Sequence, residues 1–261
     1  MKPIDESCRC DFEWKAQWIW KSGKTGRNEF AYFRKEYNLV KKPAHALAYV
    51  SAHNHFELFI NGEKVSGYVV PAHTHPEKSK YYLCYDIGDL LRCGMNAVCA
   101  SAHYIGGGGQ NYVDGLPGFI LQCSIAYDDN TEDTFITDET WKVLGDTPFK
   151  NGTEFQQNRR ISAVEDYDAR KQREGWLFSG FDDSLWQQAG KSPIHGKGWI
   201  LKPQRIPEGK IYEIITPEAA GIQKNGLQVF DAGEIITGWP RVELPGIRDV
   251  QVRMRYSEDM Q

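Results

Sequence analysis

The sequence has 261 residues, and 31 basic against 35 acidic side chains give it a formal net charge of −4 at pH 7. The length allows one large domain or two ordinary domains with a substantial core, and the charge argues against a nucleic-acid-binding protein, which would carry a basic face. No stretch approaches the roughly 18 consecutive apolar residues of a membrane span, and the start lacks the apolar core of a secretory signal. We therefore expect neither a nucleic acid nor a membrane as a partner.

The dominant hydrophobic period along the chain is two, which is the period of a half-buried strand. Asn61-Gly62, which follows one such alternating stretch, is a strong signal for a tight hairpin turn. The one short helical stretch covers residues 86–92, and four prolines predict an extended linker over residues 192–217. Short strands with regular turns predict an all-β fold, an antiparallel β-sandwich. The clearest alternating stretches are residues 33–39, 56–60, 81–87, 119–127 and 250–256.

The cysteines indicate free thiols more than a disulfide framework, because a chain of this length can build a core without such staples. Cys84, Cys99 and Cys123 lie among alternating apolar residues, where a thiol behaves as a small hydrophobic group. Buried free thiols fit a reducing compartment. We therefore expect a cytoplasmic location, or a periplasmic one if a signal peptide has been removed.

A glycine run at residues 106–109, continued by Gln110 and Asn111, interrupts the strand pattern. It is not a phosphate-binding loop, because neither a Gly-Lys-Ser/Thr ending nor a helix follows it. Two interpretations remain open: a flexible surface loop, and a lip of exposed backbone over a ligand.

The histidines form two His-x-His pairs, His53 with His55 and His73 with His75. Residues two apart on a strand point to the same face, so His53 and His55 could share a metal with Glu57, as in a cupin-like metalloprotein. Prolines bracket the second pair, which predicts a loop there. The alternative is that these histidines are exposed or simply form hydrogen bonds.

The acidic residues do not define a catalytic pair. Glycoside hydrolysis needs two carboxyl groups about 5–10 Å apart across a sugar, and neighbouring acids in turns do not specify that arrangement. The sequence 182–184 reads as a capping turn, and Asp168 with Arg170 as a structural ion pair. We therefore assign no catalytic residue.

Several motifs, taken in order, resemble the N-terminal region of bacterial α-L-rhamnosidases. Each motif alone is weak, and the shared order and spacing carry the resemblance. The motifs are Ala-Gln-Trp-Ile-Trp at 16–20, Phe-Arg-Lys-Glu-Tyr at 33–37, Phe-Glu-Leu-Phe-Ile-Asn-Gly-Glu-Lys-Val at 56–65, Thr-Asp-Glu-Thr-Trp-Lys at 137–142, Phe-Asp-Asp-Ser-Leu-Trp at 181–186 and Asp-Ala-Gly-Glu at 231–234.

The resemblance implies a tail at 1–11, a jelly-roll β-sandwich of the galactose-binding-domain type at 12–205, and the incomplete start of a second β-sandwich at 206–261. In that family a helical (α/α)6 barrel carries the catalytic acids, and no such barrel follows in this chain. The chain alone is then expected to be an inactive, fragment-like portion of a glycoside hydrolase. It would support a downstream catalytic domain of the same gene product.

In some relatives an N-terminal sandwich binds rhamnose through calcium, so the resemblance also implies a second reading. The chain could act as a stand-alone carbohydrate-binding module for rhamnose-containing glycans, with calcium as an optional cofactor and no firm cofactor otherwise. Asn111 and Asp114 are the calcium candidates, because calcium prefers oxygen ligands. The Gln-Asn-Tyr stretch at 110–112 departs from the family's usual Gly-Gly-Gly-Trp-Tyr-like stretch. The carbohydrate candidates are Tyr104, Asn111, Tyr112, Asp114 and Trp176.

Overall fold

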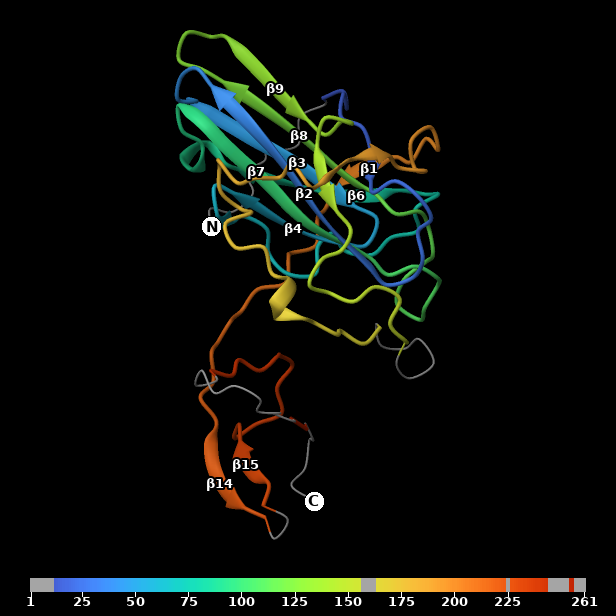
Figure 1. Ribbon diagram of the computed structural model, residues 1–261, viewed down its shortest axis with the longest axis vertical. Helices are drawn as coiled ribbons and strands as arrows, with labels where there is room; N and C mark the ends of the chain where they lie inside the picture. The colour runs from blue at the N-terminus through green and yellow to red at the C-terminus, as the bar shows by residue number, and fades with distance from the viewer. Residues whose placement is uncertain (1–11, 156–162, 224–225, 244–253, 256–261) are drawn as a thin grey trace. The chain divides into compact units, whose positions relative to one another are not determined.

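The computed structural model describes residues 12–155, 163–223, 226–243 and 254–255 (Figure 1). The chain divides into two compact units, residues 1–210 and residues 211–261. The expected tail at 1–11 and most of the alternating stretch at 250–256 lie outside the described residues. Among the described residues, no helix is long and apolar enough to cross a bilayer.

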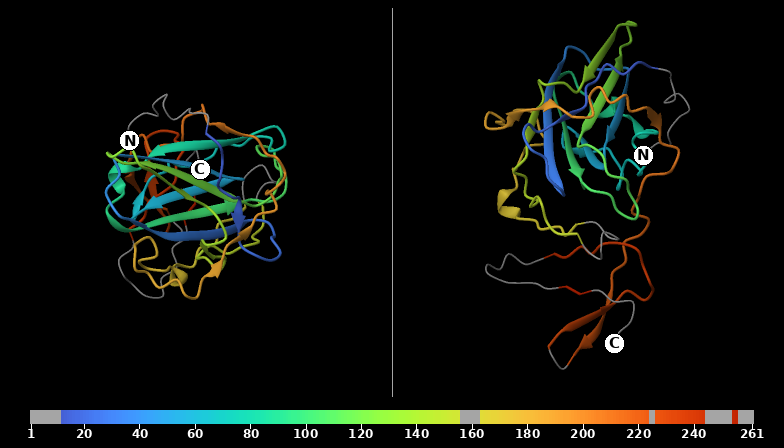
Figure 2. Two further views of the ribbon diagram at one scale, coloured as in Figure 1. Left: turned by 90° about the horizontal axis from the view of Figure 1, so that it is seen from above. Right: turned by 90° about the vertical axis from the view of Figure 1, so that its right-hand side faces the viewer.

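The first unit is a sandwich of two β-sheets (Figures 1 and 2). A seven-stranded sheet has the order β12-β1-β8-β3-β6-β13, with β9 paired to β8. Its pairs are antiparallel except for β13, which runs parallel to β6. Its strands are β1 (Ile19–Trp20), β3 (His45–Ala52), β6 (Lys80–Asp86), β8 (Phe119–Ala126), β9 (Glu132–Ile136), β12 (Gly190–Lys191) and β13 (Leu201–Pro203).

The second sheet of the sandwich has six antiparallel strands in the order β11-β10-β2-β7-β4-β5. The long pair of β2 with β7 runs in unbroken register from Glu29 opposite Tyr104 to Leu39 opposite Gly94. The strands are β2 (Glu29–Leu39), β4 (His55–Ile60), β5 (Glu63–Lys64), β7 (Gly94–Tyr104), β10 (Lys142–Leu144) and β11 (Gln187–Gln188). Two short 3-10 turns complete the unit, η2 (Gly88–Leu90) and η4 (Ala169–Lys171).

The core lies between the two sheets, because alternate residues of each strand point inward. On β4 these residues are Phe56, Leu58 and Ile60, which the period-two pattern predicted. The antiparallel sandwich expected from the sequence is therefore confirmed. The 86–92 stretch, expected to be helical, forms only the single turn η2.

The Asn61-Gly62 hairpin is also confirmed, since it joins β4 to β5. Both residues have positive φ values, 51° and 91°, the combination that a tight hairpin turn requires. Cys84, Cys99 and Cys123 are buried free thiols, as predicted.

The expected linker at 192–217 belongs largely to the first unit. Ser192 and Ile194 are each only 2% exposed, and β13 adds a strand to the seven-stranded sheet. Glu208 accepts hydrogen bonds from the Gly67 backbone at 2.6 Å and from the Tyr85 hydroxyl at 2.9 Å. These contacts lie within the first unit, which runs to residue 210.

The second unit contains a two-stranded antiparallel sheet of β14 (Glu218–Ile222) and β15 (Gln228–Asp231). Its pairing has an irregularity between Ala219 and Gly221. Assignment of this unit as the start of a second sandwich stays a prediction.

Candidate functional site

The glycine-rich loop connects β7 to β8 and is held in place by one carboxylate. Asp114 Oδ1 accepts hydrogen bonds from the backbone N–H groups of Gly107 and Gly115, each at 2.8 Å. The Tyr104 hydroxyl, at the end of β7, donates to the Gly115 carbonyl at 2.8 Å. The Asp114 carboxylate therefore holds the glycine-rich loop in a defined conformation.

His53 lies directly under this loop and is 3% exposed. Its ring centroid is 5.6 Å from that of Tyr104 and 5.5 Å from that of Trp199. A Cβ atom at Gly115 would come within 2.2 Å of His53 Cε1, so only glycine allows the loop to lie this close. Burial lowers the pKa of His53 to about 3, with a further contribution from the nearby Lys80 charge.

Three more histidines form a row with aromatic rings beside the loop. His55 and His103 are register partners on β4 and β7, and Phe30 lies opposite His103 on β2. The Phe30 and His103 rings stack with centroids 4.0 Å apart and an interplanar angle of 2°. His73 continues the row, with its centroid 4.9 Å from that of His55 and 5.6 Å from that of Tyr112.

These imidazoles are neutral at physiological pH. Burial lowers the pKa of His55 to about 3 and that of His103 to about 4, and it lowers the pKa of His73 as well. Lys80 is a positive neighbour of His55 and of His73. The region beside the glycine loop therefore combines the buried His53 and Lys80 with the half-buried rings of His55, His73 and His103.

Comparison with known proteins places this sandwich in a family. The α-L-rhamnosidase N-terminal domain profile matches residues 41–211. The chain belongs to this family. An α-L-rhamnosidase from Formosa agariphila is 31% identical over 254 residues, which cover 88% of this chain and 25% of that protein.

Solved structures show the same fold. The α-L-rhamnosidase from Dictyoglumus thermophilum has a TM-score of 0.69 and 27% identity, covering 85% of this chain and 26% of that one. The rhamnosidase of family GH78 from Bacillus sp. GL1 has a TM-score of 0.63 and 28% identity, covering 80% and 21% of the two chains. The chain thus spans about a quarter of the length of the curated relatives that it matches.

Within this rhamnosidase N-terminal domain, the structure brings four of the five carbohydrate candidates together. Tyr104, Asn111, Tyr112 and Asp114 all lie at the glycine loop, where Asn111 and Asp114 are exposed and Tyr112 is half-buried. Trp176 lies elsewhere. It is 4% exposed and stacks on Tyr32 at 4.4 Å between centroids.

Trp176 and Tyr104 contact opposite faces of the six-stranded sheet. Trp176 packs against Ala97 and Cys99 of β7, whereas Tyr104 shares the inner cluster with the alternate residue Val98. Successive residues of a strand point to opposite faces. Trp176 therefore belongs to the covering of the outer face and has no place at the loop.

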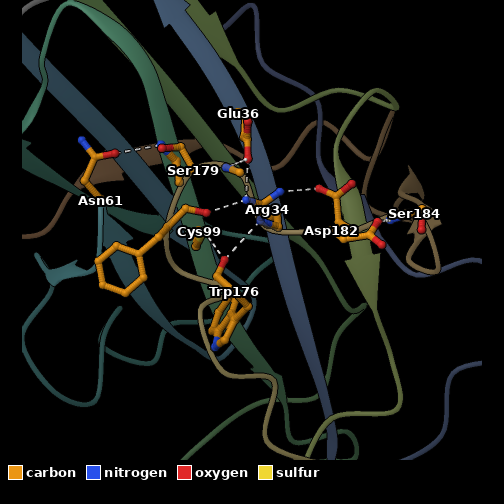
Figure 3. Close-up of polar contacts among 12 residues, drawn as sticks. Arg34, Glu36, Asn61, Cys99, Trp176, Ser179, Asp182 and Ser184 are labelled. Atoms are coloured by element: carbon orange, nitrogen blue, oxygen red, sulfur yellow. Dashed lines mark hydrogen bonds and ion pairs between the residues drawn. The ribbon is translucent and has the colours of Figure 1, made fainter.

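Arg34 holds the segment around Trp176 against the outer face of the sheet. The sequence pattern did not indicate this role. Its side chain is 1% exposed and pairs with Asp183 at 2.5 Å and with Glu36 at 2.7 Å. It also donates to the carbonyls of Trp176 at 3.1 Å and Phe178 at 2.7 Å (Figure 3). The predicted capping turn at 182–184 is present, since the Ser184 N–H donates to Asp182 Oδ1 at 3.0 Å.

A shallow depression of about 330 Å³ lies beside this arginine. Lys35, Thr140 and Lys142 line it together with Arg34 and Glu36. It is open to solvent and has no buried unpaired group, so we do not assign it as a binding site.

The geometry of the described residues gives little support to either metal hypothesis. Among the described residues, no group of three or more His, Cys, Asp or Glu side chains is arranged to hold a metal ion. His53 and His55 contact different sets of rings, and Glu57 pairs with Lys64, so the cupin-like set does not converge. For calcium, Asp114 and Asn111 supply few of the roughly 6–8 oxygens required, so other ligands would have to be backbone carbonyls and water.

Proposed function

We propose that this chain is the non-catalytic N-terminal part of an α-L-rhamnosidase and supports a catalytic domain of the same gene product. The match of residues 41–211 to the N-terminal domain family carries this proposal. The α-L-rhamnosidases that it resembles are about four times as long as the matched region, since the match covers 25–28% of their length.

The surface of the second unit agrees with a supporting role. It exposes apolar side chains that a folded protein normally buries, including Tyr212 at 90%, Ile214 at 79% and Trp239 at 61%. Exposed apolar surface of this kind marks contact with another protein part. A further domain that packs on residues 211–261 would remove this surface from water.

An activity assay tests the non-catalytic role. We expect the purified 261-residue chain to release no aryl alcohol from an aryl α-L-rhamnoside above the buffer rate. A longer product of the same gene, assayed at equal concentration, serves as the positive control. Turnover by the chain alone at the rate of that control would overturn the proposal.

Removal of the region tests the supporting role. If a catalytic domain follows in the same gene product, deletion of residues 1–261 should lower its melting temperature, because the apolar contact surface would be lost. An unchanged melting temperature in the deleted protein would contradict support by packing.

A finer proposal is that the glycine loop contacts a neutral sugar through Tyr104, Tyr112, Asn111 and Asp114. Asp114 supports it, because its carboxylate is exposed and is fixed by two backbone hydrogen bonds beside the ring of Tyr104. We expect calcium and L-rhamnose together to raise the melting temperature, since ligands that bind only the native state stabilise it. Asp114→Asn keeps the Oδ1 acceptor and should lose the calcium-dependent part, whereas no shift in the wild type at millimolar ligand would refute sugar contact.

A further inference from the structure

The connection between β5 and β6 contains a strained residue, Val69. Its φ of 54° lies in the left-handed region, where the other non-glycine members among the described residues are three asparagines. Asparagine tolerates this region, whereas a β-branched side chain is sterically disfavoured there. The Val69 side chain is 65% exposed, so its own packing does not stabilise this conformation. Contacts of the neighbouring residues must therefore hold the backbone in place.

The backbone on the N-terminal side of Val69 is held by Glu208 and Gly209. Tyr68 and Gly209 exchange two backbone hydrogen bonds, in which the Tyr68 N–H donates at 3.0 Å and the Gly209 N–H donates at 3.1 Å. The Gly67 N–H donates to Glu208 Oε2 at 2.6 Å. A Cβ atom at Gly67 would come within 2.9 Å of the Gly209 carbonyl oxygen, and one at Gly209 within 2.8 Å of the Tyr68 carbonyl oxygen. The two backbones can approach this closely because both positions are glycine.

The backbone on the C-terminal side of Val69 is held from two directions. The Phe56 N–H of β4 donates to the carbonyl of Val70, which is fully buried, at 2.8 Å. The Ala72 N–H donates to Gln204 Oε1 at 2.7 Å. Val69 is therefore the exposed residue of a loop, residues 66–72, that is fixed on both sides of it.

Residues 204–209 are themselves tied to the seven-stranded sheet. They follow β13, and the Gln204 N–H donates to the Tyr82 carbonyl of β6 at 2.8 Å. Glu208 Oε2, which binds the 66–72 loop, also accepts a hydrogen bond from the Tyr85 hydroxyl at 2.9 Å. Tyr85 is 5% exposed and belongs to the core between the sheets. One carboxylate oxygen therefore connects the 66–72 loop to the core.

The 66–72 loop leads directly into His73, which contacts the glycine loop. The His73 ring centroid lies 5.6 Å from that of Tyr112 and 4.9 Å from that of His55. His73 follows Ala72 in the chain, and the Ala72 N–H is bound by Gln204. A shift of the 66–72 loop would therefore move His73 relative to Tyr112.

We propose that residues 204–209 form a strap that holds the 66–72 loop in a strained conformation and keeps His73 against Tyr112. Release of the strap lets Val69 return to an ordinary backbone conformation and moves His73 away from the glycine loop. The strap is the last part of the first unit before the second unit begins, so a change in the path of the chain there acts on the strap first. The strap acts whether or not the glycine loop binds a sugar.

Glycine variants of two exposed valines test the strain. Val69→Gly should relieve it, because glycine adopts positive φ without a steric penalty. Val40→Gly is the control, since Val40 is 79% exposed and lies outside the left-handed region. Both changes make the unfolded chain more flexible, so the difference between the two melting temperatures reports the strain. We expect Val69→Gly to melt about 2–4 °C above Val40→Gly, and equal midpoints or the reverse order would overturn the proposal.

Glutamate variants test the strap. Glu208→Met removes the acceptor that binds the 66–72 loop, whereas Glu77→Met removes an exposed carboxylate from the same connection between β5 and β6. We expect Glu208→Met to speed amide hydrogen exchange at Tyr68 and Ala72 at least tenfold and to shift the ring resonances of His73, while the amides of β2 and β7 keep their protection. Glu77→Met should do neither. Unchanged exchange, faster exchange throughout the sandwich, or His73 resonances that do not move would each overturn the proposal.

The double variant separates strain from simple loss of contact. In the Val69→Gly background, Glu208→Met should shift the His73 resonances less than it does in the wild-type background, because the strain that drives the loop away has been removed. An equal shift in the two backgrounds would refute the strained strap. That outcome leaves the rhamnosidase assignment intact, because the family match and the activity assay do not depend on the strap.

Discussion

Replacement of Arg34 by methionine should separate the segment around Trp176 from the outer face of the six-stranded sheet. Arg34 connects β2 to this segment through the Asp183 carboxylate and two backbone carbonyls, and it also pairs with Glu36 on its own strand. Breaking a buried ion pair by removing one partner costs about 3–5 kcal/mol. The Asp183 and Glu36 side chains are 24% and 23% exposed, so water can reach them in part, and we expect the lower limit of about 3 kcal/mol.

This loss of stability should lower the melting temperature by a measurable amount. In a domain of about 150–250 residues, 1 kcal/mol lowers the melting temperature by roughly 2–4 °C, so Arg34→Met should lower it by about 6–12 °C. Differential scanning calorimetry measures the midpoint. Tryptophan fluorescence should move to longer wavelength before global unfolding, because Trp176 and Trp186 lie in the released segment.

The matched control is Arg170→Met. Arg170 also pairs with an aspartate, Asp168 at 2.8 Å, but its side chain is 90% exposed. Surface ion pairs contribute little, so the control should leave the midpoint unchanged. The reasoning fails if Arg34→Met shifts the melting temperature by no more than Arg170→Met does.

Two further predictions concern the histidines and the glycine beside the loop. His53 and His55 have pKa values near 3 in the folded chain against 6.5 as the reference, so their contribution to stability is complete above about pH 6.5 and is lost as the pH falls toward 3. Urea unfolding at pH 6.5 and at pH 5 should show that the free energy of unfolding falls by at most about 1.4 kcal/mol per pH unit for each histidine. His55→Phe should make this fall smaller. A free energy of unfolding that does not change over this interval would contradict burial of the neutral rings. Gly115→Ala should destabilise the chain by about 1–3 kcal/mol in the same assay, because its Cβ would meet the His53 ring at 2.2 Å. Gly108→Ala, whose Cβ would have its nearest neighbour at 3.9 Å, is the control, and equal stability of the two variants would count against a tight loop.

The sequence by itself determined the sandwich and several of its local features. Period-two alternation depends on the geometry of a single strand, so the inward-facing residues of β4 could be predicted without knowing their partners. The Asn61-Gly62 turn depends only on the positive φ values that these two residues tolerate. The Asp168 and Arg170 ion pair and the turn at 182–184 are equally local.

The tertiary structure alone decided what covers the outer faces of the sheets and what gathers at their ends. The local sequence pattern around Lys80 and around Trp176 is compatible with either an exposed or a buried side chain. Lys80 is buried at the position where β13, about 120 residues later in the chain, pairs with β6. Trp176 is buried because Arg34 and the ring of Tyr32 hold its segment against the sheet. Likewise, His55 and His103 meet only through the register of β4 with β7. Periodicity shows which side chains share a face of one strand, but the partner of that face is set by contacts between residues far apart in sequence, which no local pattern encodes.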